Sequence, residues 1–330
     1  MSVRGLTRRE LVGAGLALGT LSLSACRPRA ETRVFVGKAT DYARDLTPLL
    51  LDALAELGVD RTEVAGRRVL LKPNLVEARP AAPINTHPQV VRAAAEAFRR
   101  LGAAEVRVGE GPGHCRDTRR VLEASGLAEV LRHDKLSFVD LNRQPGFVTP
   151  NAGGRSGLTR LTLPQALVES DLVVSLAKMK THHWAGVTLS MKNLFGVMPG
   201  SYYGWPKNVL HYAGLEETIL DITATVRPQL AIVDGIVGME GDGPIMGDPR
   251  PAGVLVVGRN ATAVDATAAR LMGVDPLRVR YLAAANGWLG PIDAAAIDQV
   301  GERLADLVTP FRLVAAIPGM RGLAGPGLDY

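Results

Sequence analysis

The chain has 330 residues, and its 38 Lys and Arg against 33 Asp and Glu give a formal net charge of +5 at pH 7. It has no basic block long enough for a nucleic-acid groove, and aromatic residues make up only 5%, so few rings are available for base stacking. The composition therefore argues against nucleic acid as a partner. A hydrophobic content of 47% and 36 glycines are typical of a globular α/β chain.

The first 25 residues have the pattern of an export signal. The segment Thr7–Val12, with its two arginines, resembles a twin-arginine signal, and an uncharged apolar run at 11–25 follows it that is too short to span a membrane comfortably. The run ends in LSAC at 23–26, which resembles a lipoprotein cleavage site with Cys26 as the lipidated residue. We expect the twin-arginine machinery to export the domain to the cell envelope, where the lipid on Cys26 holds it at a membrane. An uncleaved anchor or a plain cleaved signal is the alternative.

Cysteine usage limits the cofactors. If Cys26 is lipidated, only Cys115 remains, so neither an internal disulfide nor a cysteine-ligated iron-sulfur cluster is expected within one chain. Any metal would need nitrogen and oxygen ligands, with at most one sulfur. Proteins exported through the twin-arginine route are commonly folded around a cofactor first, which favours a tightly held cofactor without identifying it.

Strands and helices alternate along the mature chain. Short β-rich runs and helical periodicities follow one another, with strands expected at 34–36, 69–71, 106–108, 172–176, 230–233 and 254–257, and helices at 46–57, 86–102 and 215–226. This alternation predicts an α/β fold, with mainly parallel sheets and helices on both faces. The Pro-, Gly- and Asn-rich residues 146–157 predict a linker or a hairpin region. We therefore expect two lobes, 26–145 and 158–330, around a polar cleft.

The stretch Asp171–Gly200 has the densest set of polar side chains. Its opening apolar run predicts a buried strand, and the candidate catalytic residues follow that strand: Lys178, Lys180, His182, His183 and Lys192. Groups just beyond the carboxyl end of a buried strand lie where open α/β sheets bind ligands. Thr188 is expected to cap a short helix that carries Lys192.

The residue types in this stretch indicate an anion site. Lysine binds phosphate or carboxylate as a point charge, and a desolvated lysine can act as a base. Histidine exchanges a proton near neutral pH. Each residue alone is equally well explained as a solvated surface charge, whereas the set favours a site for a small anionic molecule.

Two further strand ends supply candidate cofactor-binding residues. Lys72 and Asn74 follow one strand, and the loop GEGPGHC at 109–115 follows another. Glycines in such a loop let backbone N–H groups approach an anion, although a plain tight turn explains the string as well. With the amide that follows Lys192, the candidate set is Lys72, Asn74, Gly111, Gly113, His114 and Asn193.

A Gly-rich acidic loop follows the strand expected at 230–233. Asp234, Glu240 and Asp242 lie within nine residues, so they are candidate oxygen ligands for a divalent metal. Ion pairs between this loop and the lysines are the alternative. Asp265 lies within an apolar helix and is a candidate partner for Lys178, Lys180 or Lys192, because a buried carboxylate needs one.

Six strings resemble the domain of unknown function 362 family and occur in that family's order: LLKPN (70–74), THP (86–88), KMKTH (178–182), MKNLFG (191–196), VDGIVGMEGDGP (233–244) and AVDATAARLMG (263–273). The activity of that family is not established. Some members carry ferredoxin inserts with iron-sulfur clusters, and this chain has none. The N-terminal lobe is more distantly similar to the nickel-pincer lactate racemase family, through GHCR at 113–116 and ASG at 124–126. The DHTRP string of that family is absent, and KPNLVEARP stands at 72–80.

These observations predict an exported lipoprotein that binds a small anionic ligand or cofactor, with a divalent metal as an optional component. If the protein is an enzyme, a lysine or histidine base would suit proton transfer next to a carboxylate. A non-catalytic solute-binding or cofactor-binding protein is one alternative. A redox accessory protein, as the iron-sulfur members imply, is another.

Overall fold

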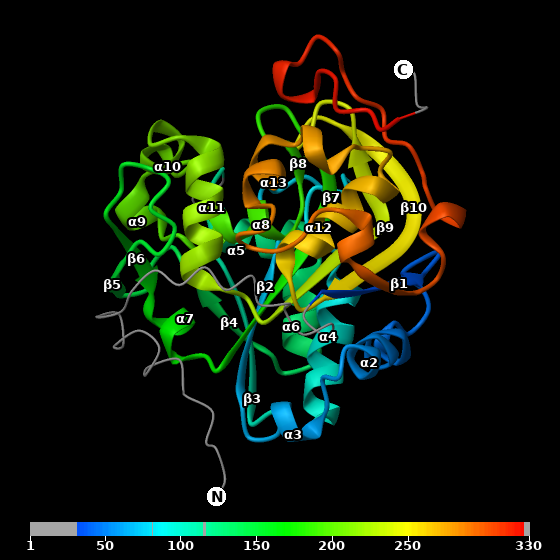
Figure 1. The fold of residues 1–330 in the computed structure, drawn as a ribbon. Coiled ribbons are helices and arrows are strands. Elements are labelled where there is room, and N and C mark those ends of the chain that lie inside the picture. The colour runs from blue at the N-terminus through cyan, green and yellow to red at the C-terminus, as the bar shows by residue number, and fades with distance from the viewer. Residues whose placement is uncertain (1–31, 81, 115–116, 327–330) are drawn as a thin grey trace, which may run out of the picture.

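The computed structural model describes residues 32–80, 82–114 and 117–326, coloured in Figure 1. The expected signal at 1–25, the lipidation site Cys26 and the thiol Cys115 lie outside these residues. Within the described ranges no helix is both long and apolar enough to cross a membrane.

One nine-stranded sheet is the centre of the described structure. Its strands are β1 (Arg33–Lys38), β2 (Arg68–Pro73), β3 (Glu105–Glu110), β4 (Ser137–Asp140), β7 (Leu172–His182), β8 (Gly186–Thr188), β9 (Leu230–Glu240), β10 (Asp248–Gly258) and β11 (Asp298–Gly301). Their order is β11-β1-β10-β9-β7-β2-β3-β4, and β8 pairs with β7. The run from β9 to β4 is parallel, while β10 is antiparallel to both of its neighbours. The predicted α/β class with a mainly parallel sheet is confirmed.

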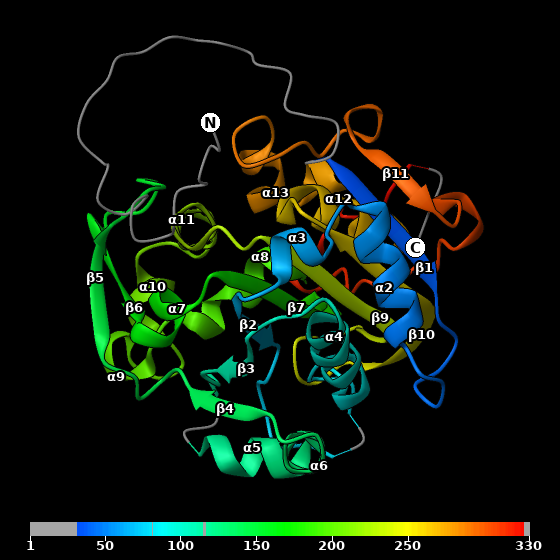
Figure 2. The same cartoon turned by 90° about the horizontal axis from the view of Figure 1, so that it is seen from below.

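Helices cover both faces of the sheet (Figures 1 and 2). One face is packed by α2 (Thr47–Glu56), α3 (Arg61–Val64), α4 (Pro88–Arg100), α5 (Thr118–Ala124) and α6 (Leu127–His133). The other face is packed by α7 (Gln165–Glu169), α8 (Ser190–Asn193), α10 (Asn208–Tyr212), α11 (Leu215–Val226), α12 (Ala261–Leu271) and α13 (Arg280–Ala285). Side chains alternate between the two cores along each strand, so Val173 and Val174 lie in different cores.

Short elements complete the chain. They are α9 (Gly200–Tyr203) and the 3-10 helices η1 (Leu194–Val197), η2 (Pro276–Arg278), η3 (Ala294–Ala296), η4 (Leu304–Asp306) and η5 (Pro318–Met320). The strands β5 (Gly146–Pro150) and β6 (Arg160–Pro164) form a separate antiparallel hairpin. Figure 2 shows this hairpin at the margin of the molecule, beside α7.

The main sheet contains strands from both sides of the expected lobe boundary. β2 from the first half pairs in parallel with β7 from the second, from Val69 with Leu172 to Pro73 with Leu176. The residues expected as a linker or hairpin, 146–157, begin with β5, which forms a hairpin with β6. The described residues therefore do not form two separately built sheets, and a cleft between two lobes is not what positions the polar side chains.

An irregularity in the pairing of β7 with β9 gives two lysines of β7 different partners. The register with β9 shifts between Lys178, which pairs with Asp234, and Lys180, which pairs with Met239. Two positions of β7 separate these lysines, whereas five positions of β9 separate their partners, so the extra residues lie in β9. The two lysines consequently have different partners.

Candidate functional site

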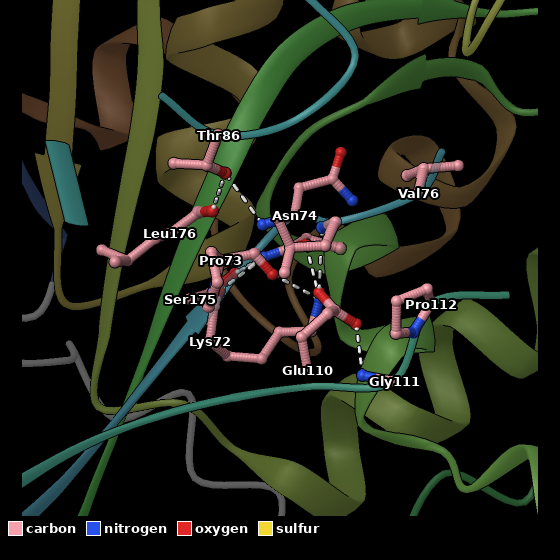
Figure 3. A network of polar contacts seen from close by, with 12 residues as sticks. Lys72, Pro73, Asn74, Val76, Thr86, Glu110, Gly111, Pro112, Ser175 and Leu176 are labelled. Atoms are coloured by element: carbon pink, nitrogen blue, oxygen red, sulfur yellow. Dashed lines mark hydrogen bonds and ion pairs between the residues drawn. The ribbon is translucent and has the colours of Figure 1, made fainter. Parts of the chain in front are cut away.

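A buried ion pair joins the ends of β2 and β3. The ammonium of Lys72 donates to Glu110 and to Asn193 Oδ1, the latter at 2.7 Å, and neither charged side chain is more than 1% exposed. Glu110 also accepts the backbone N–H of Leu75 at 3.2 Å. It accepts that of Gly111 at 2.9 Å, as Figure 3 shows. Burial lowers the pKa of Lys72 and raises that of Glu110, and the contact between the two charges offsets both effects. Lys72 is therefore held by the protein itself.

A second buried pair satisfies Lys178. Its Nζ donates to Asp234 Oδ2 at 2.9 Å and to the hydroxyl of Tyr42 at 2.8 Å, and that hydroxyl donates to Asp234 Oδ1 at 2.8 Å. The backbone N–H of His87 donates to Asp234 Oδ2 at 3.0 Å, and the His87 ring stacks on Tyr42 with centroids 3.6 Å apart. Burial lowers the pKa of Lys178, which Asp234 partly counteracts. Lys178, Asp234 and the Tyr42 hydroxyl thus satisfy one another, so a structural role explains these three groups.

The three carboxylates expected to hold a metal do not converge. Asp234 belongs to the Lys178 cluster, and Glu240 accepts the backbone N–H of Arg312 at 2.9 Å. Asp242 is 56% exposed, with its Oδ1 3.9 Å from His183 Nδ1. Among the described residues no group of three or more His, Cys, Asp and Glu has an arrangement that could hold a metal ion. The alternative expectation, an ion pair with a lysine, holds for Asp234. Glu240 and Asp242 do not belong to the Lys178 cluster.

Most of the remaining candidates line one cavity of about 160 Å³ at the carboxyl ends of β2, β3 and β7. We refer to it as the inner cavity. The predicted residues that line it are Asn74, Gly111, Gly113, His114, Lys180, His182, His183, Lys192 and Asn193. Lys72 and Lys178 do not line it. Strand ends far apart in the sequence therefore bring these side chains together, as the parallel sheet requires.

The lysines of the inner cavity are buried and lack carboxylate partners. Lys180 is fully buried, and its Nζ donates to the backbone oxygen of Ile84 at 2.7 Å. Lys192 is 9% exposed, and its Nζ lies 3.7 Å from the centre of the Phe195 ring. Burial lowers the pKa of Lys180 well below its ordinary value, and burial with the nearby Lys72 charge lowers that of Lys192 to about 7. Within the described residues, neither ammonium has a carboxylate at ion-pair distance.

His182 is a neutral ring with a defined tautomer. Its Nδ1 accepts the backbone N–H groups of Trp184 at 3.1 Å and Ala185 at 3.2 Å, so Nε2 carries the proton. Burial, followed by the charge of Lys192, lowers the pKa of His182 well below its ordinary value. The ring is thus a donor and not a cation at neutral pH.

Two buried oxygens on the wall of the inner cavity have no hydrogen-bond partner in the described part of the chain. They are Asn74 Oδ1 and Thr188 Oγ1. Buried polar atoms are nearly always paired with protein, water or a ligand. These two atoms therefore identify places where a bound molecule or ordered water makes hydrogen bonds.

The helix that carries Lys192 is fixed by a residue from another element. Asp265 on α12 accepts the backbone N–H of Ser190 at 2.7 Å and of Met191 at 2.9 Å, which are the first two residues of α8. The expectation that Thr188 caps this helix is wrong, because Thr188 lies in β8 and its hydroxyl is unpaired. The expected pairing of Asp265 with a lysine is also wrong, because backbone groups occupy its carboxylate.

The glycine loop packs closely and does not leave all of its N–H groups free. The N–H of Gly111 donates to the backbone oxygen of Gly196 at 3.0 Å as well as to Glu110. A Cβ added at Gly196 would lie 1.8 Å from Glu110 Oε1. Gly111 and Gly196 therefore enclose the Lys72–Glu110 pair, which differs from the expected role of Gly111 as a free donor.

The structure adds Lys207 and His211 to the inner cavity. Lys207 is 2% exposed and its Nζ donates to Asn142 Oδ1 and to the backbone oxygen of Met198, while burial lowers its pKa to about 7. His211 donates from Nδ1 to the backbone oxygen of Lys207 at 3.0 Å. The sequence signal for Lys207 is weak, because it is a single lysine that follows Trp205 and Pro206 outside any motif. Its backbone φ of 69° is a rare conformation for a lysine, which only the structure reveals.

Comparisons with known proteins agree with the motifs. The family model described as domain of unknown function (DUF362) matches residues 69–270. The thylakoid-associated protein sll1697 of Synechocystis sp. (strain ATCC 27184 / PCC 6803 / Kazusa) is 31% identical over 225 residues, which are 66% of this chain and 67% of that protein. The lactate racemase apoprotein from Thermoanaerobacterium thermosaccharolyticum has a TM-score of 0.47 and 13% identity, and the similar region spans 74% of this chain and 58% of the racemase chain. The family match and the 31% identical relative show that this chain belongs to the DUF362 family.

Proposed function

We propose that this protein binds a small anion with a carboxylate or phosphate group in the inner cavity. The observation that supports this most is the set of three buried lysines without a carboxylate partner among the described residues: Lys180, Lys192 and Lys207. An isolated buried ammonium is costly, and each of these side chains either loses its proton or gains a counter-charge. An anion in the cavity supplies that counter-charge.

The carboxylates near the inner cavity do not neutralise these three lysines. Glu110 lines the cavity, but Lys72 already pairs with it. Lys178 has Asp234 as its own partner outside the cavity. Two buried lysines are thus paired with carboxylates of the protein, and the three that line the cavity have no such partner among the described residues. This division favours ligand binding over a purely structural role for the second group.

The neutral groups fit a polar organic acid or a phosphate ester. The Nε2–H of His182 is a donor, and the free lone pairs of Asn74 Oδ1 accept a hydroxyl or an N–H group. Thr188 Oγ1 can donate or accept. Such a mixture orients a ligand that carries a hydroxyl beside its anionic group.

We further propose that, if turnover occurs, it is proton transfer next to a carboxylate with Lys192 as the base. A general base works best when its pKa is near the ambient pH, and burial with the nearby Lys72 lowers the pKa of Lys192 to about 7. Lys180 and Lys207 would then stabilise the negative charge that develops on the substrate. Binding without turnover is the alternative, and a search for solvent-deuterium exchange into a bound 2-hydroxy acid separates the two.

The binding proposal is tested by calorimetry with phosphate, acetate and a 2-hydroxy carboxylate on the domain without its signal. Lys192→Met is the test variant, and Lys38→Met, at an exposed position on β1, is the matched control. We expect at least one anion to bind the native protein and Lys38→Met equally, and to bind Lys192→Met about tenfold more weakly or worse, which corresponds to about 1.4 kcal/mol. Equal affinity of all three proteins, or no binding to any, would contradict the proposal.

We also propose that the protein works outside the cytoplasm, held at a membrane by a lipid on Cys26. The twin-arginine pattern and the LSAC string at 23–26 support this proposal. The inner cavity would then meet anions of the cell envelope and not the cytoplasmic pool.

A further inference from the structure

A wider groove adjoins the inner cavity. It has a volume of about 870 Å³, and we call it the outer groove. His183, Trp184 and His211 line both spaces, so these three side chains form the boundary between them. The two spaces are adjacent parts of one concave region.

The inner cavity is too small for more than the head of an organic ligand. Its volume of about 160 Å³ is close to that of an engineered cavity of ~150 Å³ that holds benzene, which has six heavy atoms. A phosphate or a short carboxylate fills such a space. Any larger ligand with its anionic group near Lys192 must extend past the boundary residues into the outer groove.

Aromatic rings form the path between the two spaces. Phe195 beside Lys192 lies 5.4 Å from His211, and His211 lies 5.6 Å from Trp184, measured between ring centroids. Trp184 lies 4.6 Å from His183, with the two rings nearly perpendicular at 84°. Edge-to-face contacts of this kind are a preferred arrangement of aromatic rings. The wall of the ligand path therefore consists largely of ring faces and edges.

The outer groove exposes large aromatic surface. Trp184 is 56% exposed, and Tyr212, which lines the outer groove only, is 89% exposed. Exposed aromatic side chains that gather at a concave site often mark a place where a ligand covers them. An indole and a phenol bind flat apolar groups through their faces.

The arginines of the outer groove each contact the protein. Arg280 Nη2 lies 2.5 Å from Glu216 Oε1, and Arg278 Nε lies 3.5 Å from Asp275 Oδ2. Arg321 donates from Nε to the backbone oxygen of Ala315 at 3.2 Å. The side chains of Arg278 and Arg280 remain 54% and 75% exposed, so the groove offers a ligand positive charge beside the aromatic faces.

We propose that the natural ligand has two parts: an anionic head that occupies the inner cavity, and a flat apolar body, such as an aromatic ring, that lies in the outer groove against Trp184 and Tyr212. This inference rests on the proposed function, because the head is the anion bound there. It adds the chemical class of the ligand, an aryl or similarly flat organic acid or phosphate ester.

The test compares ligands with and without a ring. Phosphate is compared with phenyl, benzyl and 2-phenylethyl phosphate, and acetate with benzoate, phenylacetate and 3-phenylpropionate, by calorimetry. These series vary the spacing between head and ring, and the two heads distinguish a phosphate ester from a carboxylic acid. We expect at least one aryl ligand to bind about tenfold more tightly than its head alone.

Three variants assign the gain to the outer groove. Trp184→Ala and Tyr212→Ala should remove most of the gain from the ring. The ratio of the dissociation constant of the head alone to that of the aryl ligand should then approach one. Trp184→Ala keeps the backbone N–H that donates to His182, so the fold of the turn is retained. Tyr202→Ala, which removes a 52% exposed tyrosine outside both spaces, should leave the ratio unchanged.

The outcomes separate this inference from the proposed function. Binding of phosphate or acetate without any gain from a ring overturns the two-part ligand and leaves the anion site intact. A gain that persists in both Trp184→Ala and Tyr212→Ala overturns the placement of the body. No binding of any head or aryl ligand overturns both.

Discussion

Asp265 accepts the backbone N–H of Ser190 at 2.7 Å, and this contact joins helix α12 to the first residue of helix α8. The same carboxylate accepts the N–H of Met191, so the two orphan donors at the start of α8 are satisfied by one fully buried side chain. Lys192 and Asn193 complete this four-residue helix. Their positions in the inner cavity therefore depend on an acid that is 73 residues away from Lys192 in the sequence.

Removal of that acid should affect both stability and binding. Asp265→Ala leaves two buried N–H groups without acceptors, at roughly 1 to 3 kcal/mol each, so we expect the free energy of unfolding to fall by about 2 to 6 kcal/mol. Anion affinity should fall as well, because α8 is released. Urea unfolding and calorimetry measure the two effects. Asp60→Ala is the control: it removes an exposed cap of α3, should cost about 1 kcal/mol and should leave anion affinity unchanged. Equal effects of the two variants on affinity would contradict the positioning role.

Lys192 should make stability depend on pH in a characteristic direction. Its pKa of about 7 in the folded protein is below the ordinary 10.5, so the unfolded chain binds more protons between these values. The free energy of unfolding should therefore rise as the pH increases from about 7 to 10.5, by at most about 1.4 kcal/mol per pH unit from this group. Lys192→Met should be more stable than the native protein at pH 7 and should have a flatter profile above it. Parallel profiles for the native protein and Lys192→Met in urea unfolding would rule out this interpretation.

Anion binding should be coupled to proton uptake. An anion beside Lys192 favours the charged amine and raises its pKa, so above about pH 7 a proton is taken up when the complex forms. Affinity should decrease as the pH rises from about 7 to 9. Calorimetry in two buffers with different ionisation enthalpies measures the number of protons directly. Lys192→Met should bind with less proton uptake, whereas proton release by the native protein would contradict the proposed site.

Gly196 should not tolerate a side chain. A Cβ there would lie 1.8 Å from Glu110 Oε1 and 2.5 Å from Lys72 Nζ, so Gly196→Ala must separate the buried ion pair or move η1. We expect a loss of about 3 kcal/mol or more in the free energy of unfolding. Gly157→Ala is the matched control, because a Cβ at that position meets no atom within 4 Å. A loss of less than about 1 kcal/mol for Gly196→Ala would show that the pair adapts easily.

The N-terminal residues make the export proposal testable. Replacement of Arg8 and Arg9 by lysine should retain the full-length chain in the cytoplasm, since the arginine pair is the recognition element of the signal. Cys26→Ser should leave export intact and prevent lipid attachment, so the chain should leave the membrane fraction. Cell fractionation and intact-protein mass measure both results. A Cys26→Ser protein that stays with the membrane would indicate an uncleaved anchor.

The sequence identifies the elements of the fold better than their arrangement. The runs at 69–71, 106–108 and 172–176 fall within β2, β3 and β7, because β-branched and leucine side chains suit strands that are buried on both faces. The position of β10 between β9 and β1, antiparallel to both, is set by pairing between residues far apart in the chain. Local patterns carry no information on such pairing. The expectation of two lobes is made without it.

The candidate site shows the same limit. The strand-end rule correctly suggested that Lys180, Lys192 and Asn74 would meet, since parallel strands end at one edge of a sheet. It could not separate Lys72 and Lys178 from the other lysines. Their partners Glu110 and Asp234 are 38 and 56 residues away in the sequence, and only the folded chain shows which ammonium groups are already neutralised.

The unbroken pairing of β2 with β7 has a consequence for ligand exchange. The floor of the inner cavity is built on strands whose mutual hydrogen bonds run from Val69 and Leu172 to Pro73 and Leu176. A hinge between the two halves of the chain would have to break these bonds, so this protein cannot open as clamshell binding proteins do. We infer that entry and release instead depend on rotamer changes of the boundary side chains His183, Trp184 and His211. Gating of this kind acts on one small aperture while the sheet stays rigid.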